Sequence, residues 1–146
     1  MTQLIDRRFL LRAAMVGGLG ACLADVRACE FFCSTLRVTH PWTRASAPGA
    51  STAIISMKFD EVREDERLIG LETPVAARAE IGGAGAGREL NFLIPAGQDT
   101  QLSEAGTFIR LIGLKHPLES GRSYPLTLIF EKGGRIEADL SVDFDS

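Results

Sequence analysis

From about residue 35 onward, apolar and polar residues alternate along the chain with a period of two. The clearest run places Ile136, Ala138, Leu140, Val142 and Phe144 in alternation with polar residues. Such alternation puts one face of a strand on a core and the other in water. A second strand pattern covers residues 124–130, and Lys132-Gly133-Gly134-Arg135 lies between it and this run. A Gly-Gly turn between two strand patterns predicts a hairpin.

Further strand patterns recur at short intervals and are separated by turns rich in Gly and Pro. They cover residues 35–40, 53–59, 67–73, 88–94 and 107–114, with 76–81 as another candidate. About seven to nine short strands at this spacing predict an all-β Greek-key barrel or sandwich. No helical pattern of convincing length, internal repeat or second domain is visible, and we expect one domain over 29–146.

Residues 1–28 read as an export signal rather than as part of the fold. The paired Arg7-Arg8 and the apolar residues after them resemble a twin-arginine (Tat) signal. The apolar stretch 13–24 that follows is too short to span a bilayer. We prefer cleavage after Ala28, although a cut after Ala24 and lipid attachment at Cys22, in a lipobox-like Leu19-Gly20-Ala21-Cys22, stay open. The signal predicts a periplasmic protein without a transmembrane helix in its mature form.

Charge and cysteine usage narrow the choice of function. Removal of 1–28 takes away four arginines and two aspartates and changes the net charge from −3 to −5. An acidic chain is a poor nucleic-acid binder. Each of the cuts leaves only Cys29 and Cys33 as free thiols, and two cysteines in an oxidising compartment suggest a pair.

The segment Cys29-Glu30-Phe31-Phe32-Cys33 admits several interpretations. On a helical turn this spacing would allow a disulfide between Cys29 and Cys33. A redox-active dithiol, a Cu(I) site formed by both cysteines with His40, and two unpaired thiols are the alternatives. No nucleophile motif such as G-x-S-x-G is present, and we expect a binding or carrier protein rather than an enzyme.

Several segments are similar, in order, to those of one known family. They are Trp42-Thr43-Arg44-Ala45 with Pro48-Gly49, Arg67–Gly70 with Thr73–Ala76, Ile94–Gly97, Leu111–Lys115 with Pro117-Leu118, and Tyr124–Leu128 with Phe130-Glu131. Together they resemble the periplasmic copper chaperone PCu(A)C family. The resemblance implies a cupredoxin-like β-barrel, Cu(I) as cargo, and delivery toward the binuclear copper centre of respiratory oxidase, with oxidase assembly proteins as partners.

The resemblance also implies where the copper ligands should lie. The family holds Cu(I) with a His…Met…His-x-Met pattern, whose imidazole and thioether groups suit this soft ion. The positions that match the two histidines and the last methionine hold Gly82, Phe108 and Arg110, and no methionine precedes Ile94. We therefore expect the family's Cu(I) site to be degenerate in this chain.

Four other features have ordinary structural interpretations. The charge run 60–67 is expected to be a solvated loop, and the glycine run 82–87 a flexible hairpin connection. Met57 is expected in the core and His116 on the surface. Three functions stay open: a PCu(A)C-like carrier linked to copper delivery, a metal-free relative that binds another periplasmic protein or a small ligand, and a Cys29/Cys33 thiol-redox protein. During export the Tat translocase would be a further partner.

Overall fold

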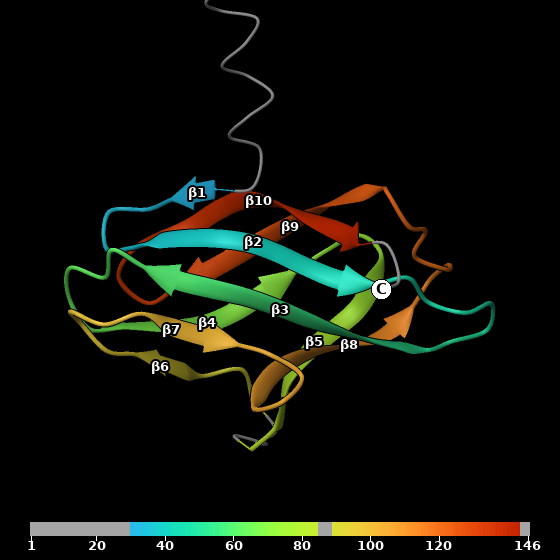
Figure 1. Cartoon of the computed structure of the whole chain (residues 1–146), viewed down its shortest axis with the longest axis horizontal. Helices are drawn as coiled ribbons and strands as arrows, with labels where there is room; N and C mark the ends of the chain where they lie inside the picture. The colour runs from blue at the N-terminus through green and yellow to red at the C-terminus, as the bar shows by residue number, and fades with distance from the viewer. Residues whose placement is uncertain (1–29, 85–88, 144–146) are drawn as a thin grey trace, which may run out of the picture.

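The period-two pattern of the sequence becomes a curled β-sheet in the computed structural model, which describes residues 30–84 and 89–143 (Figure 1). Its regular elements within these ranges are all strands. They are β1 (Glu30–Phe32), β2 (Arg37–Arg44), β3 (Thr52–Asp60), β4 (Glu66–Glu72), β5 (Ala76–Gly83), β6 (Phe92–Ile94), β7 (Thr100–Leu102), β8 (Thr107–Leu114), β9 (Ser123–Phe130) and β10 (Gly134–Asp143). The all-β prediction is confirmed.

The strands form a nearly closed barrel in which neighbours in space are often distant in sequence. Their order is β5-β8-β3-β2-β10-β9-β4-β6, with β1 attached to β2 and β7 attached to β3. All pairs are antiparallel except β10 and β2, which run parallel. β4 and β5 lie beside each other without pairing, so the barrel keeps one seam that no ladder closes.

The last hairpin forms as the alternation and the Gly-Gly turn predict. β9 and β10 pair antiparallel with Gly134 opposite Phe130, and Gly134 has a φ of 77° that an L side chain rarely adopts. Ala138, Leu140 and Val142 are buried on one face of β10, while Glu137 lies on the exposed face. Phe144, the last residue of the predicted run, lies outside the described residues.

The core fills the barrel between its walls. Its largest fully buried side chains are Phe59, Phe130, Ile55, Leu68, Ile94, Leu102, Ile109, Leu111, Leu118, Leu126, Leu128 and Leu140. Met57 is also buried, at 2% exposure, as predicted. Phe59 meets the Phe130 ring edge to face at 6.1 Å, a favoured aromatic geometry that joins β3 to β9 across the core.

Two predictions about loops are wrong. The glycine run is not a hairpin connection, because β5 pairs with β8 whereas β6 pairs with β4, and the chain crosses between them. Residues 85–88 of that run lie outside the described residues. The charge run is not uniformly solvated either, since Asp60 and Glu66 at its two ends are buried, with exposures of 6% and 1%.

Candidate functional site

One end of the β5–β8 ladder brings together the three positions that the sequence singled out. Gly82 lies directly opposite Phe108, and Glu80 lies opposite Arg110 in the same ladder. Because residues two apart on a strand point to the same face, Phe108 and Arg110 lie on one face of β8. The structure therefore gathers Gly82, Phe108 and Arg110 into one small surface.

The Phe108 ring occupies the space beside Gly82. A Cβ atom added at Gly82 would lie 2.5 Å from Cε2 of Phe108, so close that the ring would have to shift. A Cβ at Gly83 would meet the same ring at 3.0 Å and the Gly106 carbonyl oxygen at 2.0 Å. Phe108 is only 7% exposed. The two glycines are thus the floor on which this ring packs.

A charged pair lies beside the ring. The Arg110 guanidinium carbon lies 5.4 Å from the Phe108 ring centroid, within cation–π range. Nη1 of Arg110 also lies 3.9 Å from Oε1 of Glu80. This surface offers an aromatic ring, a guanidinium and a carboxylate, and among these groups only the carboxylate has a lone pair for a metal.

Cys33 lies at the turn between β1 and β2. Its Sγ is 3.2 Å from Oγ1 of Thr35 and lies against Gly133, where an added Cβ would be 2.8 Å away. Oγ1 of Thr35 donates its proton to Oε2 of Glu66 at 2.8 Å, and the Cys33 thiol also lies 3.7 Å from the Leu36 carbonyl oxygen, to which it donates. Cys33 carries a free thiol. The side chain thus packs between the N-terminal hairpin and the β9–β10 turn.

The proposed partner of Cys33, Cys29, lies outside the described residues, so a disulfide between them stays a prediction. The local geometry assumed for it is wrong, however. The intervening residues form strand β1 instead of a helical turn. Extended backbone advances about 3.3 Å per residue, which separates residues four apart far more than a helical turn does.

His40 marks the point where β2 changes neighbours. Residues up to Thr39 pair with β1, whereas those from Trp42 onward pair with β10. His40 itself has a φ of 46°, stacks on Trp42, and lies 3.2 Å through Nε2 from Oδ2 of Asp143. The imidazole thus connects the irregular point of β2 to the end of β10.

Cys33 and His40 lie at opposite ends of the β1–β2 ladder. The Cys33 N–H bonds to Leu36, and three strand pairs separate that turn from His40. At the rise of extended strands this is on the order of 10 Å, too far for both side chains to bind one ion. Within residues 30–84 and 89–143, no three His, Cys, Asp or Glu residues group as metal ligands.

Glu66, at the start of β4, is a buried charge with four hydrogen-bond donors among the described residues. Its carboxylate accepts hydrogen bonds from the backbone N–H groups of Arg67, Lys132 and Gly133, in addition to Thr35. Burial raises the pKa of Glu66, but these four donors outweigh it and hold the pKa below its ordinary value. Glu66 thus connects β4 to Thr35, just before β2, and to the β9–β10 turn.

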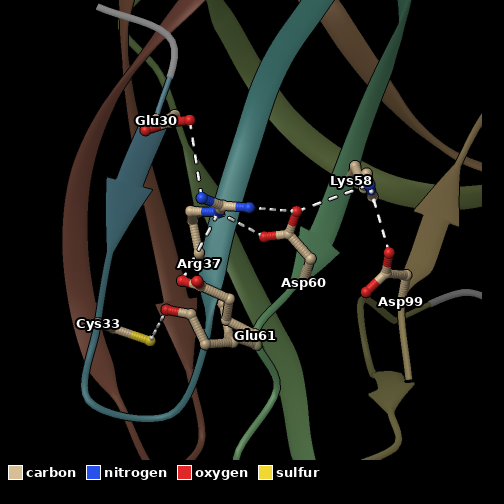
Figure 2. A network of polar contacts seen from close by, with 8 residues as sticks. Glu30, Cys33, Arg37, Lys58, Asp60, Glu61 and Asp99 are labelled. Atoms are coloured by element: carbon tan, nitrogen blue, oxygen red, sulfur yellow. Dashed lines mark hydrogen bonds and ion pairs between the residues drawn. The ribbon is translucent and has the colours of Figure 1, made fainter. Parts of the chain in front are cut away.

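A second buried acid, Asp60, forms the centre of the network in Figure 2. Arg37 donates two hydrogen bonds to it, Nε to Oδ1 at 2.6 Å and Nη2 to Oδ2 at 2.8 Å. These bonds, with the Coulombic attraction of Arg37 and Lys58, hold the pKa of Asp60 below its ordinary value. Lys58 bridges on to Asp99 at 3.3 Å, and Arg37 lies 3.7 Å from Glu30 of β1.

Sequence reasoning missed Asp60 and Glu66 because both stand in a charge run. The signal that could have found Glu66 is its parity. Glu66 stands two residues before Leu68, so the alternation of β4 extended by one step points it inward. His116 is exposed in its loop, as predicted, with Nδ1 2.9 Å from the Pro117 carbonyl oxygen.

The chain is similar in sequence to one known family and to a curated protein. The family described as "Putative lipoprotein LpqE-like" matches residues 36–142. A protein of Leifsonia xyli subsp. xyli (strain CTCB07), named "Putative lipoprotein Lxx21020", is 29% identical over 110 residues. That alignment covers 67% of this chain and 63% of the relative, so the chain spans less than two thirds of that protein's length.

Two solved structures share the architecture. The apo PCuAC domain from PmoF1 superposes with a TM-score of 0.73 at 28% identity and covers 80% of this chain and 99% of that domain. The copper-bound PCuAC domain from PmoF2 gives a TM-score of 0.73 at 24% identity, covering 80% of this chain and 98% of the other. The predicted cupredoxin-like barrel is therefore confirmed.

Proposed function

The chain belongs to the LpqE-like family, a branch of the PCu(A)C copper chaperones, and we propose that it is an exported binding or carrier protein whose barrel has lost the family's Cu(I) site. Copper chaperones are carriers and not enzymes. The observation that carries the proposal is the surface formed by Gly82, Phe108 and Arg110.

The donor set of this surface does not fit Cu(I). This ion prefers thioether, thiolate and imidazole ligands, and a phenyl ring and a guanidinium supply none of them. Arg110 places a positive charge where a cation would have to lie. The nearby Glu80 is a hard oxygen ligand within 3.9 Å of that guanidinium. Phe108 moreover fills the volume that a side chain at position 82 would need.

The test is an anaerobic Cu(I) titration in a background where Cys22, Cys29 and Cys33 are changed to Ser. We expect no stoichiometric Cu(I) binding by this protein. The variant Gly82→His, Phe108→His and Arg110→Met should gain about one equivalent, because it restores two imidazoles and a thioether to one surface. Stoichiometric Cu(I) binding by the cysteine-free protein, abolished by Arg110→Glu or Phe108→Ala, would refute the proposal.

Any copper chemistry that persists is assigned to the N-terminal cysteines. The free thiol of Cys33 supports a role for this residue in Cu(I) binding or thiol exchange, and participation of Cys29 stays a prediction. His40 is not a third ligand for an ion held by Cys33, since it lies at the far end of the β1–β2 ladder. Cu(I) bound by the reduced protein and lost on Cys29→Ser with Cys33→Ser supports copper delivery toward oxidase assembly. Disulfide exchange without copper binding supports the redox alternative.

The family description also bears on location. Lipoproteins carry lipid on an N-terminal cysteine, and this supports lipid attachment at Cys22 over cleavage after Ala28. Within the described residues no helix could cross a bilayer. Radiolabelled palmitate incorporated by the native host, and lost on Cys22→Ala, is the expected result. A mature N-terminus at Cys29 by mass spectrometry would instead support cleavage after Ala28 on the Tat route to the periplasm.

A further inference from the structure

Strand β1 is held to the barrel along one edge. Its residues pair with the first half of β2, and among the described residues β1 has no second ladder, although it lies beside β10 (Figure 1). Its last side chain, Phe32, is 60% exposed. The same half of β2 is held independently by β3, because Arg37 lies opposite Asp60 in that ladder and donates two hydrogen bonds to its carboxylate. Separation of β1 would therefore leave the rest of the sheet paired.

The turn that follows β1 is anchored at Thr35. This residue is 3% exposed, and its hydroxyl donates to Glu66. Its carbonyl oxygen accepts a hydrogen bond from the Arg63 N–H at 2.8 Å. Ser34, one residue earlier, is exposed. The firmly held part of the turn thus begins at Thr35, and Cys33 is the residue on the β1 side of it that contacts the barrel.

Cys33 holds the end of β1 through its backbone and its thiol, on the turn that Figure 2 shows between β1 and β2. Its N–H bonds to the Leu36 carbonyl oxygen at 3.1 Å, and its Sγ lies 3.7 Å from that oxygen and 3.2 Å from Oγ1 of Thr35. Because Thr35 gives its own proton to Glu66, both oxygens present lone pairs to the S–H group. A sulfur that carries another group in place of this proton donates to neither oxygen.

The space beside the sulfur is limited by Gly133 of the β9–β10 turn. A Cβ atom added at Gly133 would lie 2.8 Å from Sγ and 3.3 Å from Cβ of Cys33, and 3.2 Å from Oγ1 of Thr35. The sulfur thus lies in the space that a side chain at position 133 would occupy. A group attached to the sulfur has to turn away from Gly133, because packed interiors leave no spare room for it on that side.

We propose that the Cys33 thiol is a latch for β1, which opens when a group becomes bound to the sulfur. The group replaces the proton that the thiol donates and turns the side chain away from Gly133. β1 then separates from β2, with Ser34 as the hinge, while Thr35 stays bound to Glu66. Occupation of Cys33 is thereby coupled to release of the N-terminal strand. This inference goes beyond the proposed function, because it holds for any group on the sulfur, with or without copper.

The test uses N-ethylmaleimide and the full chain with Cys22→Ser and Cys29→Ser, which leaves Cys33 as the only thiol. The sulfur bonds to one carbon of the maleimide double bond and the thiol proton passes to the other, so no oxidant is required. Amides that bond within the β1–β2 ladder should exchange hydrogen about fivefold faster after modification, the effect of losing one hydrogen bond. Exchange in β3, β8 and β9 should not change.

Two variants test the latch without the reagent. Cys33→Ala removes the donor, so it should show the faster β1 exchange before treatment and no further change with maleimide. Gly133→Ala places a Cβ against the sulfur at a position without a positive φ, so β1 exchange and the reaction of Cys33 with maleimide should both become about fivefold faster. Gly106→Ala is the matched control and should change neither, because its Cβ would meet nothing within 4 Å.

Unchanged β1 exchange after complete modification of Cys33 would overturn the proposal. So would faster exchange spread over β3, β8 and β9, because this would report a loss of stability of the whole barrel instead of release of β1. Neither measurement involves copper, so its failure is distinguishable from failure of the proposed function, which the Cu(I) titration tests.

Discussion

Substitution of Gly82 by Ala tests how much the packing of the Phe108 ring against β5 contributes to the free energy of unfolding. The new Cβ would lie 2.5 Å from Cε2, 3.0 Å from Cζ and 3.1 Å from Cδ2 of that ring. Ordinary contacts begin near 3.4 Å, so the ring must move by about 1 Å. The ring is 7% exposed and also rests on Gly83, which limits where it can go.

The magnitude follows from two opposing effects. Overpacking of a well-filled site costs about 1–3 kcal/mol. Replacement of Gly by Ala at a position without a positive φ, such as Gly82, stabilises by about 0.4–1 kcal/mol through the unfolded chain. We therefore expect Gly82→Ala to lower the free energy of unfolding by about 1–2 kcal/mol. When Phe108 is also Ala, only the stabilising effect remains.

The assay is urea unfolding followed by the fluorescence of Trp42, the single tryptophan of the chain. The double-mutant cycle of Gly82→Ala and Phe108→Ala should give a coupling energy of about 1–3 kcal/mol. Gly106→Ala is the matched control, because its φ is not positive and its Cβ would meet nothing within 4 Å. An equal loss on Gly82→Ala with and without Phe108 would refute the ring contact as the cause.

Three predictions concern the buried acids. Glu66→Gln should lower the free energy of unfolding at neutral pH by about 2–3 kcal/mol, because it removes a charge that accepts four hydrogen bonds. Because the pKa of Glu66 is depressed in the folded protein, its contribution to the free energy of unfolding is full above about pH 4.5. That contribution is lost as the pH falls through the folded-state pKa, so the stabilities of the native protein and the variant should converge in acid. A stability difference that stays constant over this pH range would contradict the prediction. Thr35→Val, which removes one of these donors, should cost about 1–2 kcal/mol in urea unfolding, and a neutral result would mean that water replaces the hydroxyl. Asp60→Asn should lower the free energy of unfolding at neutral pH by about 2 kcal/mol. This is less than for a fully buried ion pair, because Arg37 remains a quarter exposed. A thermal melt unchanged from the native protein would exclude a structural role for the Arg37–Asp60 pair.

The sequence predicted the strands that carry a long alternating pattern. The range 107–114 is β8 without adjustment, and β10 begins two residues before its predicted start. Burial of one strand face is a local property that period two reveals. The three-residue strands β1 and β7 were missed, because three residues are too few to show a period and their pairing depends on neighbours far along the chain.

The sequence also showed which residues form the candidate site. The positions matched to the family's copper ligands hold Gly82, Phe108 and Arg110 instead of His and Met. The tertiary structure decided what takes their place. The register of β5 against β8 sets the Phe108 ring on Gly82, and folding carries Glu66 to backbone donors 66 and 67 residues away. Glu66 and Asp60 differ from the exposed acids between them in lying in strands β4 and β3 and in the partners that the barrel supplies. The sequence by itself determines the chemistry of each residue and the local periodicity of the strands. The burial of charged groups and the seam between β4 and β5 depend on contacts between distant segments, which only the tertiary structure provides.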